Sequence, residues 1–364
     1  MRSIRSSIFL TVAILLSIGV VMIYSASSIY AYEKMGDSLY FLKRHLAYLA
    51  IGIVVMFAAM TVDINLLKRL SRPILLISLF LLILVLVPHV GKETAGARRW
   101  FKFAFLSFQP SEFAKFAVIL YTADMISRKG RLMKSFLFGY VPAVFVLGTF
   151  VGLILLEPDM GTAITISIIV MMMLFAAGVK KSHIFTSFLA ALPAVYLLLF
   201  SVPYRRKRIT AFLNPWADRK GAGFQIIQSF IALGSGGLFG VGLGQSRQKL
   251  FFLPASHTDF IFSIIGEELG LLGTASVVIL FIIFVWQGMK IVFNSYGPFE
   301  RSLSLGIVSL ITLEAIVNIG VTCGALPTKG LPLPFISYGG SGLVFRLMGI
   351  GLLLNAGKIC ETYR

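Results

Sequence analysis

Asp259 is the residue of this sequence that is best placed to do chemistry. It follows a basic and aromatic segment at 245–258, and a long apolar run comes directly after it. The carboxylate therefore lies where a polar loop meets a membrane span, and an ionisable group at that depth usually has a function. Two interpretations stay open: Asp259 caps the helix that follows, or it takes part in a reaction.

Glu112 and Lys115 form a second candidate group. They stand three residues apart at the start of an apolar run, a spacing that lets them pair on one helix face. One interpretation is a salt bridge that allows both charges to enter the membrane. The other is that Lys115 holds an anionic group, which Glu112 orients.

Further carboxylates suggest metal binding or proton chemistry. Glu157 and Asp159 flank a proline in a tight turn, where their oxygens are candidates for holding a divalent cation such as Mg²⁺ or Mn²⁺. Helix capping is the favoured interpretation for Asp159. Glu267 lies about two helical turns beyond Asp259, so it is expected to orient a partner or to raise the pKa of Asp259 by like-charge proximity.

The segment at 326–341 combines three prolines with polar side chains. Such a backbone is tolerated at membrane depth only where it is buried in protein or lines a cavity. Lys329 supplies charge, Ser337, Tyr338 and Ser341 supply hydroxyl groups, and Gly339 and Gly340 allow close backbone approach. We expect this segment to line a pocket; a structural plug is the alternative.

The elements that must position these residues are membrane spans. The chain has 364 residues, of which 57% are hydrophobic and 13% charged, and this composition excludes disorder and argues against a soluble globule. We predict an all-α polytopic membrane protein, one transmembrane domain over 1–364, with about ten helices. The predicted spans are 8–29, 45–62, 73–89, 111–127, 136–156, 161–179, 184–203, 259–289, 302–325 and 342–359.

Lysine and arginine in short loops place both termini in the cytoplasm. The opposite loops are longer and hold nearly all the unusual chemistry, including Arg98, Arg99 and the basic run at 205–208. The largest is the extracytoplasmic loop at 204–258, between the seventh and eighth spans. Within it, 224–233 has the spacing of an interfacial amphipathic helix, and the glycine-rich stretch at 234–244 is expected to be a flexible loop.

The net charge of +18 has a bearing on partners. Because the basic residues lie between apolar spans, anionic headgroups or an anionic lipid substrate fit better than nucleic acid. The glycine-rich stretch matches neither G-x-x-x-x-G-K-[ST] nor G-x-G-x-x-G, so no nucleotide cofactor is expected. Cys323 and Cys360 lie at opposite ends of the last two spans, and we predict no disulfide between them.

Several motifs together resemble the SEDS family (shape, elongation, division and sporulation), membrane proteins of bacterial cell-wall synthesis. The resemblance covers nearly the whole chain and is closer to the division branch than to the elongation branch; the sporulation branch fits too. One departure is Gly342, where the family pattern has a second serine. The matching stretches are GARRW at 96–100, FQPSE at 108–112, EPDMGT at 157–162, QKL at 248–250, HTDFIF at 257–262, GEELG at 266–270, LPTKG at 326–330 and PFISYGGS at 334–341.

The resemblance implies a peptidoglycan glycosyltransferase of the bacterial cytoplasmic membrane that polymerises lipid II, an undecaprenyl diphosphate-linked sugar, at the division septum. It also implies a class B penicillin-binding protein, the transpeptidase, and other divisome membrane proteins as partners. The family's essential acid falls on Asp259, which would act as general base, while Arg99, Lys115 and Lys329 would stabilise the departing diphosphate. Other expected substrate-binding residues are Glu112, His257, Ser337, Tyr338, Gly339, Gly340 and Ser341, supported by Gln109, Glu157, Asp159 and Glu267.

Two other functions are compatible with the same features. A lipid II flippase would also need a basic cavity with carboxylates in the membrane. Its binding site is expected near the midplane between repeats, whereas the unusual residues here gather on one side. A non-catalytic scaffold would explain the spans but not the cluster of charges.

Overall fold

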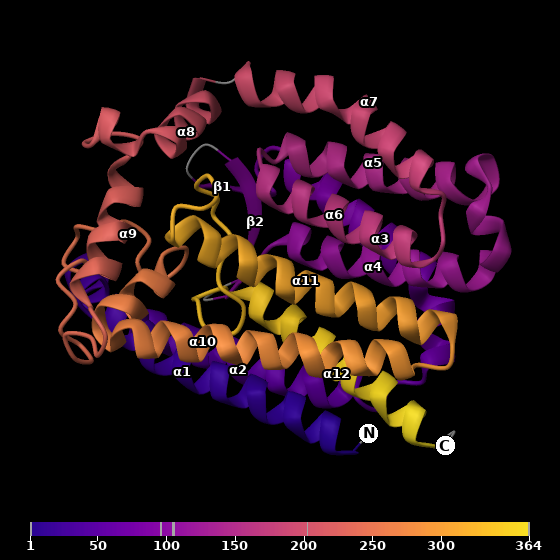
Figure 1. Cartoon of the computed structure of the whole chain (residues 1–364), viewed down its shortest axis with the longest axis horizontal. Coiled ribbons are helices and arrows are strands. Elements are labelled where there is room, and N and C mark those ends of the chain that lie inside the picture. The colour runs from indigo at the N-terminus through magenta and orange to yellow at the C-terminus, as the bar shows by residue number, and fades with distance from the viewer. Residues whose placement is uncertain (1, 95–96, 104–105, 202, 363–364) are drawn as a thin grey trace.

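The computed structural model describes residues 2–94, 97–103, 106–201 and 203–362, and it is a bundle of long helices (Figure 1). One helix overlaps each predicted span, with ends that differ by up to nine residues, as at the start of the third helix. The helices are α1 (Arg2–Met35), α2 (Tyr40–Ala59), α3 (Ile64–Leu86), α4 (Pro110–Lys129), α5 (Val141–Leu156), α6 (Met160–Ala176), α7 (Lys181–Phe200), α10 (Ile261–Asn294), α11 (Pro298–Thr322) and α12 (Ser341–Thr362).

Within the described residues, seven helices are long and apolar enough to cross a membrane, namely α1, α2, α3, α7, α10, α11 and the continuous stretch Phe136–Leu156 that contains α5. Of the others, α6 is 17 residues long, and α4 carries Glu112, Lys115 and Asp124. The predicted class, an all-α polytopic membrane protein, is confirmed.

Shorter elements build one end of the bundle. They are α8 (Pro203–Leu213), a 3-10 helix (Pro215–Asp218), α9 (Phe224–Ser235) and the three-stranded antiparallel sheet β1 (Lys92–Thr94), β2 (Ala97–Phe103) and β3 (Leu106–Phe108). A 3-10 helix (Gly130–Lys134) and a π-helix (Phe136–Tyr140) join α4 to α5. The sequence did not predict the sheet or α8, and α8 places the basic run at 205–208 on a helix rather than in a loop.

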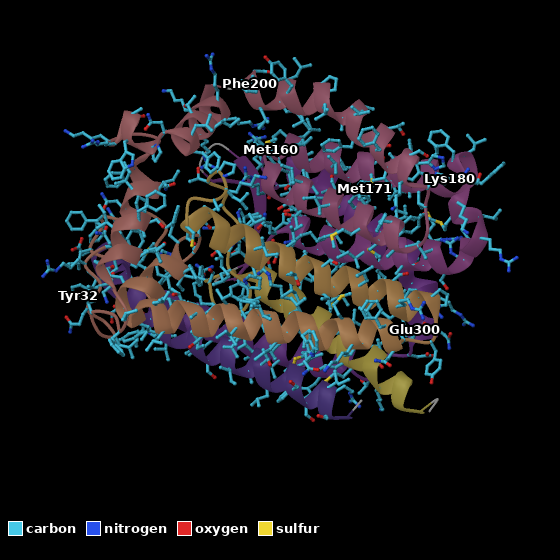
Figure 2. The ribbon with its side chains drawn as sticks, viewed as in Figure 1. Tyr32, Met160, Met171, Lys180, Phe200 and Glu300 are labelled. Atoms are coloured by element: carbon cyan, nitrogen blue, oxygen red, sulfur yellow. The ribbon has the colours of Figure 1, made fainter. Side chains whose placement is uncertain are left out.

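The core of the bundle lies around α12, which packs against α2, α4, α10 and α11. In contrast, α7 buries none of its residues and lies at the edge of the bundle, along one side (Figure 1). Both termini lie at one end of the molecule. Lys180 and Glu300 lie at that same end, whereas Tyr32 lies at the opposite end, with α8 and α9 (Figure 2). The ends of the bundle are therefore chemically distinct.

The glycine-rich stretch at 234–244, predicted to be a flexible loop, is hydrogen-bonded to α10. The helix α10 is broken at Gly270, whose φ is 67°. The amides of Leu271 and Leu272 donate to the carbonyls of Gly237 and Leu238 at 2.9 and 3.2 Å. In return, the carbonyls of Glu267 and Glu268 accept from amides of the glycine-rich stretch at 2.9 and 3.1 Å. The stretch thus satisfies the backbone groups that the break in α10 leaves without helical partners.

Candidate active site

Two adjoining cavities lie at the end of the bundle that carries the sheet and α8. One has a volume of about 270 Å³ and the other about 340 Å³. Arg99, Asp159, Asp259 and Gly330 line both. The cavities therefore meet at Asp259, where β2, the start of α6 and the segment at 326–340 converge.

A hydrogen bond to its main chain holds Asp259 in place at this junction. Its carbonyl oxygen accepts from the side-chain amide of Asn318 on α11 at 2.9 Å. Gly330 lies opposite, and a Cβ atom at that glycine would stand 3.1 Å from Oδ2 of Asp259. Glycine therefore keeps space open in front of the carboxylate. Burial raises the pKa of Asp259 to about 6, and the nearby Arg208 guanidinium acts in the opposite direction.

The larger cavity is strongly basic. Arg99, Arg205, Arg208 and Lys329 all line it. The guanidinium of Arg99 is held by the carbonyl oxygens of Glu157 and Pro158, both at 2.7 Å. Arg205 donates to Leu198 at the end of α7 at 2.8 Å, and Arg208 to Thr328 at 3.2 Å. Four cations beside two carboxylates, Asp159 and Asp259, give this space the chemistry that suits a multiply charged anion.

The smaller cavity has a mixed polar and aromatic wall. Of the predicted site residues, it contains Gln109, Glu112, Tyr338, Gly339 and Gly340 beside the four shared ones. It also contains Trp100, Ser107, Thr162, Thr258, Leu331 and Pro332, which the sequence reasoning did not single out. Hydroxyl, amide and carboxylate groups around a half-open space suit a ligand with several hydroxyl groups, because each can donate or accept.

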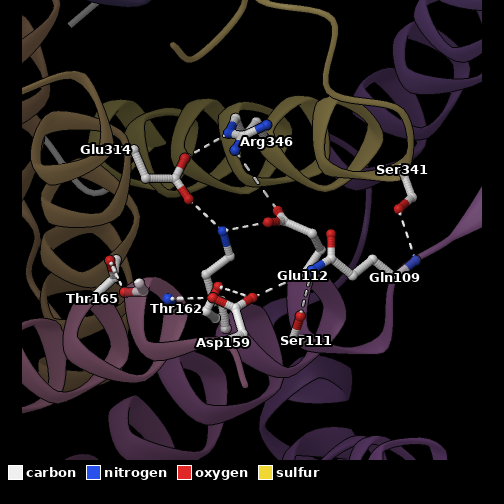
Figure 3. A network of polar contacts seen from close by, with 11 residues as sticks. Gln109, Ser111, Glu112, Asp159, Thr162, Thr165, Glu314, Ser341 and Arg346 are labelled. Atoms are coloured by element: carbon white, nitrogen blue, oxygen red, sulfur yellow. Dashed lines mark hydrogen bonds and ion pairs between the residues drawn. The ribbon is translucent and has the colours of Figure 1, made fainter. Parts of the chain in front are cut away.

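Lys115 does not reach either cavity, so its predicted contact with an anionic group is wrong. Its ammonium group binds Glu112 at 2.8 Å and also Glu314, and Arg346 binds Glu314 at 2.6 Å (Figure 3). All four side chains are buried, and the two carboxylates balance the two cations. Glycine at 342 fits this network, since a Cβ there would stand 2.8 Å from Arg346 and 2.9 Å from Glu112. The structural salt-bridge interpretation therefore holds for Lys115.

Glu267 also faces away from the cavities, so its expected effect on Asp259 is wrong. Its carboxylate accepts from the hydroxyl of Ser246 and from the backbone amides of Arg247 and Gln248 at 2.9 and 3.3 Å. Next to it, Glu268 pairs with Lys249 at 3.0 Å. These two acids fix the start of the loop that leads to Asp259, and burial rather than Glu267 raises the pKa of Asp259.

The two predicted cation ligands, Glu157 and Asp159, lie in different surroundings. Glu157 is fully buried and does not line a cavity; burial, with a contribution from Asp159, raises its pKa to about 8. Asp159 caps α6, as its favoured interpretation had it: its oxygens accept from the amide and hydroxyl of Thr162 at 3.1 and 2.9 Å. Within the described ranges, no group of three His, Cys, Asp or Glu residues is arranged to hold a metal ion.

Three predicted substrate-binding residues act within the protein instead. The ring of His257 packs 4.5 Å from that of Phe41, and its carbonyl oxygen accepts from the amide of Tyr338. Ser337 donates to the carbonyl of Thr258 at 2.6 Å, and Ser341 accepts from the amide of Gln109 at 3.0 Å (Figure 3). None of the three lines either cavity, and their hydrogen bonds hold the walls together; their contact with a substrate stays a prediction.

The sequence reasoning also left Arg205, Arg208 and Asn318 without an individual role. The spacing of the two arginines held a signal, because residues three apart share one face of a helix, but α8 was not predicted. Cys323 is a free, exposed thiol, and the side chain of Cys360 lies outside the described residues. The prediction about a disulfide between them is not tested.

The fold and the cavities define a polytopic membrane protein with a buried acid beside a basic cavity at one end of its bundle. The chain belongs to the FtsW/RodA/SpoVE family of cell cycle proteins, whose pattern matches residues 5–361.

Named relatives match over nearly their whole length. The chain is 46% identical to the probable peptidoglycan glycosyltransferase FtsW of Geobacter sp. (strain M18), over 96% of this chain and 95% of that one. It is 44% identical to stage V sporulation protein E of Bacillus subtilis (strain 168), over 95% and 94% of the two chains.

Solved structures share the fold. A chain from a structure titled for the coordination of polymerization and crosslinking by a peptidoglycan synthase complex has a TM-score of 0.79 and 30% identity, with 97% of both chains covered. The rod shape determining protein RodA of Thermus thermophilus has a TM-score of 0.72 and 28% identity, with 96% of this chain and 95% of that one covered.

Proposed function

We propose that the chain is a peptidoglycan glycosyltransferase that polymerises lipid II into β-1,4-linked glycan strands at the division septum and releases undecaprenyl diphosphate. The observation that carries this proposal is the position of Asp259, which lines a basic cavity and a polar cavity at once. A transferase that joins two bound sugars needs a base between a site for the departing diphosphate and a site for the accepting hydroxyl. The similarity to a relative named probable peptidoglycan glycosyltransferase FtsW supports the same activity.

The basic cavity is the proposed donor site. The donor sugar of lipid II is already activated by its diphosphate, so the reaction needs no nucleotide. Arg99, Arg205, Arg208 and Lys329 surround the place where the diphosphate would lie. Cations fixed there stabilise the negative charge that develops on the leaving group, and in a site sheltered from water this effect is large.

The polar cavity is the proposed acceptor site, with Asp259 as the general base. The carboxylate takes the proton of the 4-hydroxyl of a GlcNAc on a second lipid-linked chain. The hydroxyl oxygen attacks C1 of the donor sugar, and the bond from C1 to the diphosphate breaks with its electron pair going to the diphosphate. Attack from the opposite face converts the α linkage into a β linkage, so the product is β-1,4-linked.

A divalent cation, Mg²⁺ or Mn²⁺, stays a prediction. Glu157 is buried away from both cavities and Asp159 is engaged with Thr162, so this pair does not fit a protein-held metal. Oxygens of a diphosphate in the basic cavity would be ligands of the right chemistry for such a cation.

The proposal extends to topology and partners. Ten spans with cytoplasmic termini put the cavities on the extracytoplasmic side, where the cell wall is built. The short loops at the end with the termini are rich in lysine and arginine, which supports this orientation. A class B penicillin-binding protein, which would crosslink the new strands, is the proposed partner together with other divisome membrane proteins. The relative seen in a peptidoglycan synthase complex supports a partner of that kind.

Purified protein with its transpeptidase partner, labelled lipid II in detergent and a gel for glycan strands test the proposal. Polymer made without a bilayer to cross supports a polymerase over a flippase or scaffold. Asp259→Asn should lower the rate by about 10²–10⁴-fold, the usual contribution of a general base. Asp63→Asn is the matched control, because Asp63 caps α3 by accepting from the amide of Asn65, and asparagine caps equally well. Wild-type rates in Asp259→Asn would remove this residue from the mechanism.

A further inference from the structure

Asn318 is buried on α11 behind the wall of the cavities, with 1% of its surface exposed. Its side-chain NH₂ group donates to two backbone carbonyls, that of Asp259 at 2.9 Å and that of Leu331 at 2.8 Å. We propose that Asn318 is a positioning residue for the transferase reaction: one amide ties the segment that carries the base to the opposite wall of the cavities. This inference rests on the proposed function.

The polarity of this side chain is fixed by its partners. Both neighbours are carbonyl oxygens, so only a group with two N–H donors in one place can satisfy them. The other end of the amide, Oδ1, is buried without a hydrogen-bond partner in the part of the chain that the structure describes. A buried unpaired acceptor is costly. The NH₂ group of Asn318 makes two hydrogen bonds, whereas its Oδ1 atom makes none. The side chain is therefore retained for the two carbonyls that its NH₂ group connects.

The two carbonyls belong to opposite sides of the reacting space. Leu331 lines the smaller cavity, and it follows Gly330, which faces the carboxylate of Asp259. Asn318 itself lines neither cavity, so it acts through Asp259 and not by touching a ligand. The distance between base and wall therefore depends on a side chain outside the site.

Neighbouring bonds make the same connection. The carbonyl of His257 accepts from the amide of Tyr338 at 3.1 Å, and that of Thr258 accepts from the hydroxyl of Ser337. With the bond to Asn318, three successive carbonyls at 257–259 are tied to the last loop or to the helix beneath it. This segment is thereby held rigidly, and a displacement of about 1 Å in such a group can cost about 10²-fold in rate.

The chain contains a matched control for Asn318. Asn355 on α12 is also buried, and its NH₂ group donates to the carbonyls of Ala59 and Val62 at 3.1 and 2.7 Å. This amide binds the last residue of α2 and the turn that follows it, at the other end of the bundle from Asp259. Replacing either asparagine by leucine removes two hydrogen bonds between a buried side-chain amide and backbone carbonyls.

The test compares Asn318→Leu with Asn355→Leu in the full-length protein and its transpeptidase partner. The Tm of thermal unfolding in detergent should fall by a similar amount in both variants. Only Asn318→Leu should lower kcat for glycan polymerisation, by roughly 10–100-fold, with KM for lipid II unchanged. Its acid limb should also move to lower pH, because a loosened Asp259 is better hydrated. The smaller change Asn318→Ser, which keeps one donor, should lower kcat by less.

Equal kcat values in Asn318→Leu and Asn355→Leu, or a loss confined to KM, would overturn the positioning role. So would a protein that folds with Asn355→Leu but with neither Asn318 variant, since the amide would then serve the fold. These results are separate from the fate of the proposed function. Full activity of Asp259→Asn would refute the base, whereas an unaffected Asn318→Leu beside an inactive Asp259→Asn would refute only the positioning.

Discussion

Burial sets the ionisation of the polar groups around Asp259. It raises the pKa of Asp259 to about 6 and that of Glu157 to about 8, and it lowers that of His257 to about 4. At neutral pH, Asp259 is therefore ionised, while Glu157 and His257 are uncharged. Of these three residues, Asp259 is the one that is both charged and open to the cavities, which is what a base needs.

The rate of polymerisation should follow the ionisation of Asp259. A base works only when deprotonated, so kcat/KM should fall as pH drops through about 6. Arg208 lowers the pKa of Asp259, and Arg208→Gln should therefore move this acid limb to higher pH. A pH profile of glycan formation measures both effects.

Arg205→Gln is the control for this prediction. Arg205 lines the same basic cavity, but Arg208 is the charged neighbour that shifts Asp259. Both changes should weaken binding of the diphosphate, and only Arg208→Gln should move the acid limb. Equal movement in the two variants, or none in either, would contradict the pairing of Arg208 with the base.

At the scale of elements, α10 depends on a non-helical neighbour, the glycine-rich stretch at 234–244. Its break at Gly270 is filled by the backbone of the glycine-rich stretch, which hydrogen-bonds on both sides of the break. Gly240 comes so close that a Cβ atom there would stand 2.1 Å from the carbonyl oxygen of Glu268, and its φ is +81°. Glycine serves here for close approach as well as for its backbone angle.

Gly240→Ala should therefore destabilise the protein, because the added methyl group meets backbone that cannot move aside easily. A thermal unfolding experiment in detergent should show a clear drop in Tm. Gly234→Ala is the control: Gly234 lies in α9, and a Cβ there would meet no atom within 4 Å. Alanine favours helix over glycine, so its Tm should stay level or rise. A similar drop in both variants would mean that the close packing of Gly240 is unimportant.

The elements show how far the sequence alone could predict this protein. Long apolar runs predicted helices because each run is an independent signal of membrane length. The sheet and α8 were missed, since short polar segments take their form from tertiary contacts. Glycine-rich composition does not specify which backbone groups a segment binds. The pairing of this stretch with the break in α10 at Gly270 therefore could not be predicted. Proline and glycine at 326–341 correctly predicted irregular backbone that lines a cavity.

The candidate site was predictable in its residue types but not in its connections. The sequence singled out Arg99, Asp259 and Tyr338, and the structure brings all three to the cavities. It did not show that Lys115 already has two carboxylate partners, because Glu314 lies 199 residues away along the chain. Pairing over such distances is set by helix packing, which the sequence pattern does not specify.

At the scale of the whole molecule, chemistry and charge separate between the two ends of the bundle. The sheet and α8, which contribute residues to the cavities, lie at one end, and both termini lie at the other, with Lys180 and Glu300 (Figures 1 and 2). The sequence places short basic loops at the end with the termini. By the positive-inside rule we expect that end to face the cytoplasm, which agrees with the proposed position of the cavities on the extracytoplasmic side.

Labelling of single cysteines should reveal this orientation. Lys220 lies at the same end of the bundle as the proposed active site, and Arg131 lies at the opposite end. Both side chains are exposed, so each position can be replaced by cysteine for labelling. With Cys323 and Cys360 replaced by serine, a maleimide that does not cross membranes should label Lys220→Cys in intact spheroplasts and Arg131→Cys only after lysis. Labelling of Arg131→Cys alone in intact spheroplasts would put Asp259 on the cytoplasmic side, and polymer synthesis outside the membrane could not occur at this site.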